Sequence, residues 1–353
     1  MGRDVCNNDV QMRIEELGVD EWGNVLPERG FGVFHTPEAL TVLDHHSPGE
    51  LRLFGGFRGE EPIGLFPVHI RSNLGARLLT SPPLGFGIGR LGPVLMPSSP
   101  KQQKQESTNK EFVREVLDAA DADGALTLLR MACSTRYTDP RPFSWSGFDI
   151  TPLFTYRLDL SDTESDPLLD SFSRDLRTDI RKRDEVEFTI RTAGMDAAEH
   201  TYQSVTSRYS DQDLRVPLTW EFVRDLLESL DEERSRVYVA ETTDGEFISG
   251  MIILYSNDTA YFWKGGAKAE GWSVSPNSLL HWRVIEDILT DPELASIEAY
   301  DLYTANNERL VDYKSRFGGS LTGYYVVESN NVATTVAKKL YRTFALGKDP
   351  FSR

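Results

Sequence analysis

The chain has 353 residues, which is long enough for two domains that each bury a core of their own. Its formal net charge is -17, and this acidity argues against nucleic acid as a general surface partner. The 28 Arg and only 10 Lys, together with the acidity, are typical of the surface of a salt-adapted protein. Two cysteines cannot supply a disulfide framework. No apolar run approaches the roughly 20 residues of a membrane span, and the N-terminus lacks the apolar core of a signal peptide, so we expect a cytoplasmic protein.

Residues 12–160 are predicted to form a first α/β domain. The segment 35–46 is a helix in which Thr36 caps the N-terminus and Pro37 takes the first position. Two strands follow around an acidic glycine turn at 58–61. The remaining predicted elements are a strand and a Gly/Pro-rich loop at 76–93, a helix at 110–120, and strands at 125–133 and 154–160.

Residues 161–233 are predicted to be a helical connector and the start of a second domain. Apolar residues that recur every four positions indicate one amphipathic helix, and they are Leu168, Phe172, Leu176 and Ile180. Arg174, Arg177 and Arg181 form a second stripe on this helix, the one strongly basic surface in the sequence. The stripe has two interpretations. It either binds a phosphate, a carboxylate or a charged cofactor, or it is a solvated face whose arginines pair with neighbouring aspartates.

Residues 234–328 are predicted to form a second α/β domain that carries the active site. Strands at 248–255 and 259–267 form a hairpin. A helix begins after Ser275, which is its expected N-terminal cap, with Pro276 in the first position. The remaining predicted elements are a strand at 297–305, a helix at 306–317 ended by Gly318 and Gly319, and a strand at 320–328.

The two halves repeat one pattern. Gly64 and Gly250 occupy the same place in a run of strand, acidic turn and apolar strand, at an offset of 186 residues. Tandem copies of one α/β unit explain this repeat most simply. The alternative is a chance similarity between short α/β segments.

Seven short motifs follow one another along the chain. They are R-x-x-x-R-K at 177–182, TSRY at 206–209, VYVAE-x-x-DGE-x-ISG at 237–250, YFWKGGA at 261–267, SPNSLLHW at 275–282, YDLYTANN at 300–307 and YKSRFGG at 313–319. In this order they resemble the FemABX and related acyltransferases, over about residues 12–328. The resemblance implies tandem GNAT-like (acyl-CoA N-acyltransferase) domains with a mixed α/β sheet, and transfer of an acyl group to an amine. Fem ligases take an aminoacyl group from tRNA to extend the peptide of a cell-wall precursor, whereas looser relatives are acetyltransferases.

The sequence departs from this family in two places. The helical arm that some Fem ligases insert is absent, because the segment 183–233 leaves no room for two long helices. The Gly-rich pyrophosphate loop of GNAT enzymes is also missing between residues 267 and 279. The N-terminus of the helix at Asn277 and Ser278 could still accept an anion through its backbone N–H groups. We therefore expect acyl-CoA, such as acetyl-CoA, as the co-substrate, and no metal.

Three residues are the predicted catalytic groups. By the resemblance, Lys314 matches a lysine whose charge can meet a substrate carboxylate, a phosphate or the developing oxyanion; the alternative is a solvated helix lysine. Asp301 lies inside an apolar strand, so it is either a general base or a carboxylate held by a structural hydrogen bond. Tyr261 shares a strand face with Trp263, and the resemblance suggests that this face lines the substrate channel.

The predicted substrate-binding residues are Arg208, Trp263, Arg177, Arg181 and Arg316. By the resemblance, Arg208 contacts an acidic acceptor, and the alternative is a surface ion pair with Asp211 or Asp213. Trp263 could equally be an ordinary core aromatic. Arg316 is expected to flank the pocket of Lys314, although residues two apart on a helix point in different directions.

Two other segments carry weaker signals. The run GIGRLG at 87–92 matches a dinucleotide-binding pattern, but Pro93 follows where that fold requires a helix, so we expect a kinked loop beside the cleft. Residues 329–353 are predicted to form an amphipathic helix and tail. This helix packs on the second domain or makes a peripheral contact with an anionic membrane.

The sequence thus predicts a tandem GNAT-like N-acyltransferase acting on the amine of a small or cell-envelope-precursor acceptor. One alternative is a non-catalytic module that binds an acidic ligand. Another is a ligase without the helical arm that uses aminoacyl-tRNA.

Overall fold

The structure is a computed structural model, and it describes residues 11–73, 75–161, 163–210, 218–266, 269 and 271–330. Of the segment 329–353, predicted to form a C-terminal amphipathic helix and tail, residues 331–353 lie outside the described residues. The first half contains β1 (Arg13–Glu16), α1 (Val19–Val25), η1 (Val33–His35), α2 (Pro37–His46), β2 (Glu50–Arg58), β3 (Glu61–Asn73), β4 (Ala76–Ser81), β5 (Val94–Leu95), α3 (Gln102–Ala119), β6 (Thr127–Ala132), α4 (Arg141–Trp145) and β7 (Phe148–Asp159).

The second half repeats the alternation of helices and strands. It contains α5 (Ser165–Ser171), α6 (Arg174–Arg181), η2 (Arg183–Glu185), β8 (Phe188–Ala193), α7 (Met195–Ser210), α8 (Trp220–Arg234), β9 (Ser235–Thr242), β10 (Phe247–Tyr255), β11 (Thr259–Gly265), α9 (Pro276–Thr290), η3 (Pro292–Leu294), β12 (Ala299–Asp301), α10 (Glu308–Lys314), η4 (Ser315–Phe317) and β13 (Ser320–Ser329).

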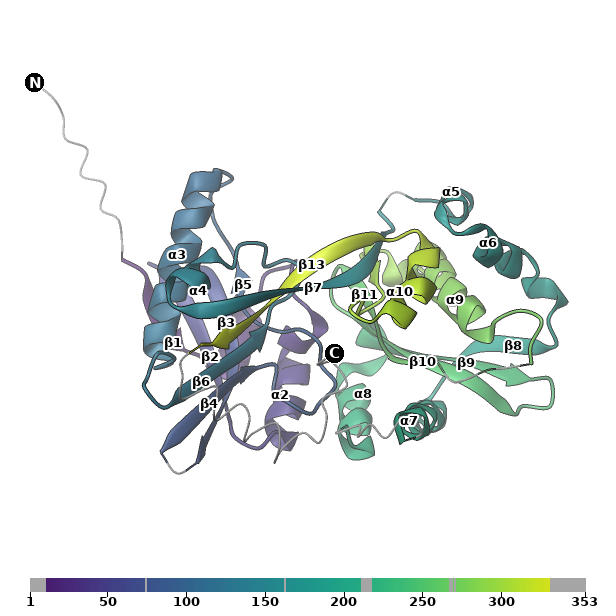
Figure 1. Cartoon of the computed structure of the whole chain (residues 1–353), viewed down its shortest axis with the longest axis horizontal. Helices are drawn as coiled ribbons and strands as arrows, with labels where there is room; N and C mark the ends of the chain where they lie inside the picture. Colours follow the sequence, from purple (N-terminus) through teal and green to yellow (C-terminus); the bar gives the residue numbers. More distant parts are fainter. Residues whose placement is uncertain are drawn as a thin grey trace, which may run out of the picture.

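Within the described residues, the strands form one mixed sheet that runs through both halves. Its order is β1-β2-β3-β4-β6-β13-β7-β12-β11-β10-β9-β8, with β5 pairing with β3. The two halves exchange their last strands. β7 from the first half pairs with β12 of the second, and β13 at the end of the second half pairs with β6 of the first. The ribbon of β7 and β13 therefore joins the halves (Figure 1).

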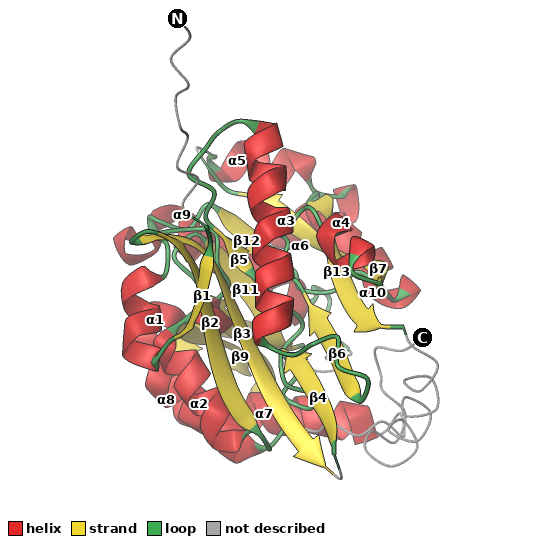
Figure 2. Cartoon of the chain, turned by 90° about the vertical axis from the view of Figure 1, so that its left-hand side faces the viewer, coloured by secondary structure: helices red, strands yellow, loops and turns green. Residues whose placement is uncertain are grey.

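Helices cover both faces of this sheet. In the first half, α3 crosses one face of the strands and α2 lies on the other side (Figure 2). In the second half, α9 and α10 lie on one side of the strands β8–β11, and α7 and α8 lie on the other (Figure 1). A separate core joins the halves, where Phe34 and Leu43 pack with Phe222 and Trp263. The site described below lies beside this shared core.

Local sequence signals explain several element ends. The Thr36 side chain accepts a hydrogen bond from the Ala39 N–H at the start of α2. The Ser275 side chain accepts one from the Ser278 N–H at the start of α9. Gly318 ends η4 with a φ of 67°, the left-handed conformation that glycine tolerates best. These predicted caps are confirmed.

Two predicted elements differ from the structure. The helix predicted across Phe172 is two helices, because Ser173 caps α6 through the Leu176 N–H and α5 ends at Ser171. The strand predicted at 297–305 is only three residues long, β12. The chain leaves the strand there because Tyr303 takes a φ of 80°, which a non-glycine residue rarely adopts.

Candidate active site

The strands β11 and β12 separate at the centre of the second half. They pair in parallel at three positions, the last of which is Tyr261 opposite Asp301. The segment after β12 then follows β7 instead, because the Leu302 N–H donates to the Tyr156 carbonyl at 2.8 Å and the Ala305 N–H donates to the Phe154 carbonyl at 2.8 Å. β11 continues to Gly265 without a strand partner on that side within the described residues. A gap opens between the two diverging chains.

The side chain of Lys314 occupies this gap. Its Nζ donates to the Leu302 carbonyl and, at 2.8 Å, to the Thr304 carbonyl, on one side of the gap. On the other side it lies 5.7 Å from the ring centroid of Phe262 in β11. The residue is only 4% exposed. Burial lowers the Lys314 pKa to about 8, an effect that the charge of Asp301 opposes.

A β-bulge orients the next residues of β11. Phe262 lies opposite Ile253 and Lys264 lies opposite Ile252, so Trp263 is an extra residue. Trp263 and Lys264 consequently face the same side of the sheet, and the Trp263 indole N–H and the Lys264 Nζ both donate to the Gly87 carbonyl at 3.1 Å. Burial, with a smaller contribution from the charge of Arg208, lowers the Lys264 pKa to about 8.

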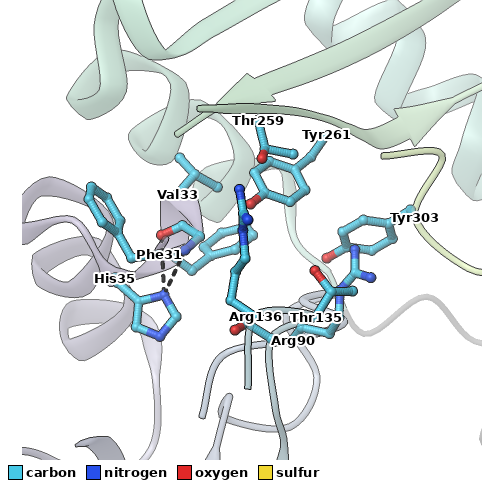
Figure 3. Close-up of a pocket in the computed structure, with 12 residues that line it drawn as sticks. Phe31, Val33, His35, Arg90, Thr135, Arg136, Thr259, Tyr261 and Tyr303 are labelled. Carbon is cyan, nitrogen blue, oxygen red and sulfur yellow. Dashed lines mark hydrogen bonds between the residues drawn. The ribbon is translucent and has the colours of Figure 1, made fainter. Parts of the chain in front are cut away.

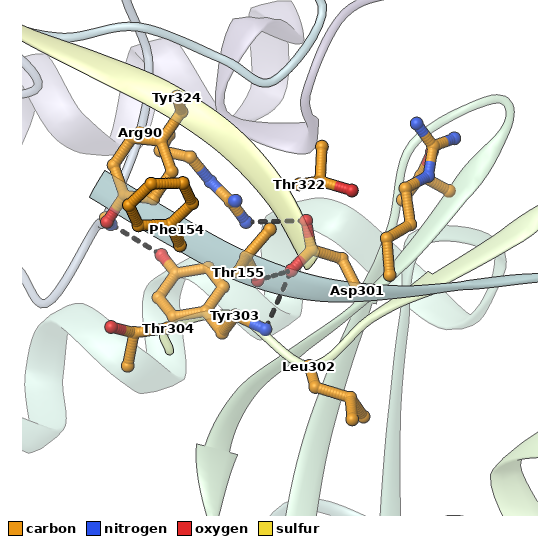
Figure 4. Close-up of polar contacts among 12 residues, drawn as sticks. Arg90, Phe154, Thr155, Asp301, Leu302, Tyr303, Thr304, Thr322 and Tyr324 are labelled. Atoms are coloured by element: carbon orange, nitrogen blue, oxygen red, sulfur yellow. Dashed lines mark hydrogen bonds and ion pairs between the residues drawn. The ribbon is translucent and has the colours of Figure 1, made fainter. Parts of the chain in front are cut away.

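A loop of the first half reaches Asp301 from the opposite side. The Arg90 Nη2 donates to an Asp301 carboxylate oxygen at 2.8 Å, and the two side chains are 7% and 1% exposed. The other carboxylate oxygen accepts from the Thr155 hydroxyl at 2.6 Å and the Tyr303 N–H at 2.7 Å (Figure 4). The Arg90 guanidinium also lies 5.3 Å and 5.0 Å from the ring centroids of Tyr303 and Tyr324. Asp301 is therefore held in a buried ion pair that joins the halves.

A cavity of about 30 Å³ lies between the halves beside this ion pair (Figure 3). The first half lines it with residues that include Phe31, His35, Arg90 and Arg136, and the second half lines it with Thr259, Tyr261 and Tyr303. Burial lowers the His35 pKa to about 4, so its imidazole is neutral at pH 7. Burial raises the Tyr261 pKa, so its hydroxyl stays protonated. The cavity thus combines aromatic walls with hydroxyl and guanidinium groups.

The sequence of the second half matches a known family. Residues 170–315 match the family described as Acetyltransferase (GNAT) domain. This segment therefore has a GNAT-like fold. The match includes the gap between β11 and β12 and ends one residue after Lys314.

Solved structures extend the similarity to the whole chain. FemX has a TM-score of 0.67 and 12% identity, and the alignment covers 94% of this chain and 99% of FemX. The C-terminal domain of a putative lysylphosphatidylglycerol synthetase from Agrobacterium fabrum has a TM-score of 0.57 and 12% identity, with 91% and 94% covered. A tandem GNAT protein from the clavulanic acid biosynthesis pathway has a TM-score of 0.52 and 12% identity, with 90% and 98% covered. The chain therefore shares the fold of FemX and of the tandem GNAT protein. A comparison with curated proteins found no match.

The GNAT domain brings some of the predicted site residues together. Lys314 lies in the gap, and Tyr261 and Asp301 form the last strand pair before it. Trp263 is 3% exposed and packs its ring edge-on with Phe34 and Phe222 in the shared core.

Arg208, Asn277 and Ser278 lie beyond the end of β11. Arg208 donates to the carbonyls of Gly265 and Gly266. The Asn277 side chain accepts a hydrogen bond from the Ser249 hydroxyl at 2.7 Å. The Ser278 hydroxyl is buried. The residues predicted to bind the acidic acceptor and the cofactor thus lie close to the same pair of glycines, Gly265 and Gly266.

The remaining predicted arginines lie away from the gap. Arg177 donates to the Asp170 carbonyl at 2.9 Å. Arg316 lies 4.0 Å from the Asp179 carboxylate of α6, so it does not share the contacts of Lys314. Arg181 is exposed at the end of α6.

Sequence reasoning missed Arg90, Lys264 and Arg136. Arg90 lies in the GIGRLG run, which matches a dinucleotide-binding pattern, and that pattern depends on the glycines and not on the arginine. Lys264 follows a bulge that alternation along a strand cannot predict. The one available signal was that a Gly-rich loop from the first half was expected beside the cleft.

Metal clusters and membrane-spanning helices do not occur in the described residues. Within them, no three His, Cys, Asp or Glu side chains are grouped so as to hold a metal ion. None of the helices in the described ranges is both long and apolar enough to cross a membrane.

Proposed function

We propose that this enzyme transfers an acyl group, acetyl or a related acyl, from acyl-CoA to the amine of a small or envelope-precursor acceptor. The observation that carries the proposal is the placement of Lys314 in the gap between β11 and β12, inside the segment that matches the GNAT domain. One structural neighbour, the tandem GNAT protein, is described as a form without AcCoA, and this mention of AcCoA supports the choice of donor. We expect the reaction in the cytoplasm.

The donor fits the gap on chemical grounds. The edge of β11 beyond Tyr261 offers backbone N–H and carbonyl groups that an extended ligand with amide groups can pair with. The N-terminus of α9 follows this edge and carries Asn277 and Ser278, where the helix dipole favours an anion such as a phosphate. A donor of this kind would place its acyl carbonyl near Lys314.

Lys314 is the proposed catalytic group. Transfer forms a C–N bond between the acceptor amine and the acyl carbon and breaks the C–S bond, with the amine proton passing to the thiolate or to solvent. The carbonyl oxygen becomes anionic in between, and a fixed cationic donor stabilises it. The ammonium of Lys314 has three N–H groups, of which two donate to the carbonyls of Leu302 and Thr304. The third is free to serve the oxyanion.

Tyr261 and Asp301 have supporting roles in this proposal. Tyr261 lines the cavity with its protonated hydroxyl and orients the acceptor. Asp301 acts through the residues it holds, because its contacts with Arg90, Thr155 and Tyr303 occupy both carboxylate oxygens. The proton of the amine therefore has no obvious route to Asp301 while this ion pair is closed.

Calorimetric titration with acetyl-CoA and with free coenzyme A tests the donor. Saturable binding by the wild-type protein, and acetylation of amines detected as released thiol, are the expected results. If Lys314 acts as a cation, the rate falls as the pH rises through about 8. Absence of both binding and turnover in a cooperatively folded protein would contradict the acyl-CoA proposal and direct the search to aminoacyl-tRNA donors.

A further inference from the structure

Arg90, which lines the cavity between the halves, has a buried cationic donor without an acceptor. The Nη1 of Arg90 has no hydrogen-bond partner in the described part of the chain, although the side chain is only 7% exposed. Arg90 donates to Asp301 through its other terminal nitrogen, Nη2. An unpaired buried donor costs about 1–3 kcal/mol, so such an atom in a native site indicates a missing partner.

The rest of the lining favours an anionic partner. Arg136 brings a second guanidinium to the cavity; its side chain is 44% exposed, and one of its nitrogens pairs with Asp258 at 2.9 Å. That carboxylate also accepts from the Gly30 N–H. None of the described residues that line the cavity is Asp or Glu. Two arginines without a lining carboxylate are unexpected in a chain with a net charge of -17.

The size of the cavity limits the ligand group. A volume of about 30 Å³ exceeds the roughly 10–15 Å³ that one water molecule needs. It suits a group of a few heavy atoms, such as a carboxylate, whose two oxygens match the fork of a guanidinium. The rings of Phe31 and Tyr261 line the cavity beside it, where they can contact the apolar part of the same molecule.

We propose that this cavity binds a carboxylate of the acceptor, which is therefore an amine that carries a carboxylate, such as an amino acid or a peptide. The Arg90 Nη1 and the free N–H groups of Arg136 receive the carboxylate. The amine then extends toward the end of the β11–β12 pair, because Tyr261 belongs both to the cavity and to that pair. This inference rests on the proposed transfer to an amine and names the class of its acceptor.

Binding of product-like probes tests the cavity without turnover. Calorimetry and thermal shift at fixed ionic strength compare N-acetyl amino acids and N-acetyl dipeptides with their C-terminal carboxamides. At least one acid is expected to bind tenfold or more tightly than its amide, about 1.4 kcal/mol. The inference is overturned if no acid binds, or if every acid binds no better than its amide.

Variants connect this preference to Arg90. Arg90→Lys keeps a cation for Asp301 but lacks the second terminal nitrogen, so it should lose the preference for acids. If that variant does not fold, the double variant Arg90→Gln with Asp301→Asn removes both buried charges and should show the same loss. Arg130→Gln is the control, because Arg130 pairs with Glu328 on β13 and does not line the cavity. An undiminished preference for acids in the Arg90 variants would also overturn the inference.

The two proposals fail in different ways. Binding of acids without acetyl transfer to any amine would contradict the proposed function and leave the cavity assignment intact. Acetyl transfer to amines with no preference for a carboxylate would contradict the cavity assignment and leave the proposed function intact.

Discussion

Each half contains a pair of neighbouring parallel strands, but only in the second half do the two strands diverge. In the first half, β4 and β6 stay paired at five positions, from Arg77 opposite Thr127 to Ser81 opposite Met131. An isolated bridge between Leu91 and Cys133 continues this contact. In the second half, β11 and β12 separate after three positions. We call β4 and β6 the closed pair, in the closed half, because they stay together. We call β11 and β12 the open pair, in the open half, because they diverge.

The helix that follows each pair shows the same contrast. In the second half, α10 ends in Lys314, whose buried ammonium lies in the gap. In the first half, α4 ends in Trp145, which is 61% exposed and contacts Lys110 and Arg141 on the surface. The comparison supports our proposal that the open half carries the chemistry and that the closed half has a structural role.

The first half still contributes to the site through one loop. The loop between β4 and α3 places the Gly87 carbonyl against Trp263 and Lys264, and it places Arg90 against Asp301. Substitutions in the open pair or in the loop that reaches it therefore test this contrast between the halves.

Removing the Arg90 charge should have the largest effect. Arg90→Gln leaves the Asp301 carboxylate buried without its cation, and we expect a loss of about 3–5 kcal/mol in the free energy of unfolding. The double variant with Asp301→Asn should recover most of this loss, because it removes both charges. Urea unfolding measures both values. A loss below about 1 kcal/mol for Arg90→Gln would show that the ion pair does not hold the halves together.

Lys314→Met should lower acyl transfer about a hundredfold while the fold survives. Losing one donor to an oxyanion typically costs about 2.7–4 kcal/mol of transition-state stabilisation. The matched control in the closed half is Lys104→Met on α3, an exposed lysine that should leave the rate unchanged. Equal rates for wild type and Lys314→Met, in steady-state assays with acetyl-CoA, would remove Lys314 from the mechanism.

The buried lysine should also give stability a defined pH dependence. Its folded-state pKa of about 8 lies below the ordinary value of 10.5, so the unfolded chain binds more protons between these two pH values. The stability of the wild type relative to Lys314→Met should therefore rise as the pH increases from 8 to 10.5. It should fall again as the pH returns to 8. Denaturant titrations of both proteins across this range check the sign, and a constant difference would contradict the burial of a charged lysine.

Gly87→Ala should have the smallest effect and isolates the docking of the loop. Gly87 has a φ of 62°, and an added Cβ would lie 2.5 Å from the Lys264 Nζ. Gly59 has a φ of 61° with nothing within 4 Å, so Gly59→Ala is the matched control for backbone strain. Both should lose about 1–2 kcal/mol of stability, but only Gly87→Ala should weaken transfer. Equal transfer activity in the two variants would show that the docking of the loop does not affect the reaction.

The sequence predicted the parts of the fold that local signals determine. The caps Thr36 and Ser275 and the glycine stop at Gly318 act within a few residues, and the structure contains all three. The repeat of Gly64 and Gly250 also follows from strand patterns that each half carries by itself. The exchange of β7 and β13 could not be predicted, because either strand is compatible with pairing in either half.

Sequence patterns could point to site residues only where a single short segment contained the whole motif. The motif around Lys314 drew on one segment, and the structure places this residue in the gap. The partner of Asp301 lies 211 positions away in the loop of the other half. No periodicity connects residues so far apart. The early end of β12 depends on the positive φ of Tyr303, and the apolar run around it gave no sign of this.

Hydrogen exchange with and without acetyl-CoA tests the central claim most directly, because it compares the open and closed pairs in one protein. We expect protection of backbone amides in β11 beyond Tyr261 and at the start of α9, with β4 and the start of α3 unchanged. Protection in the first half instead, or at neither pair, would contradict the assignment of the reaction to the open half.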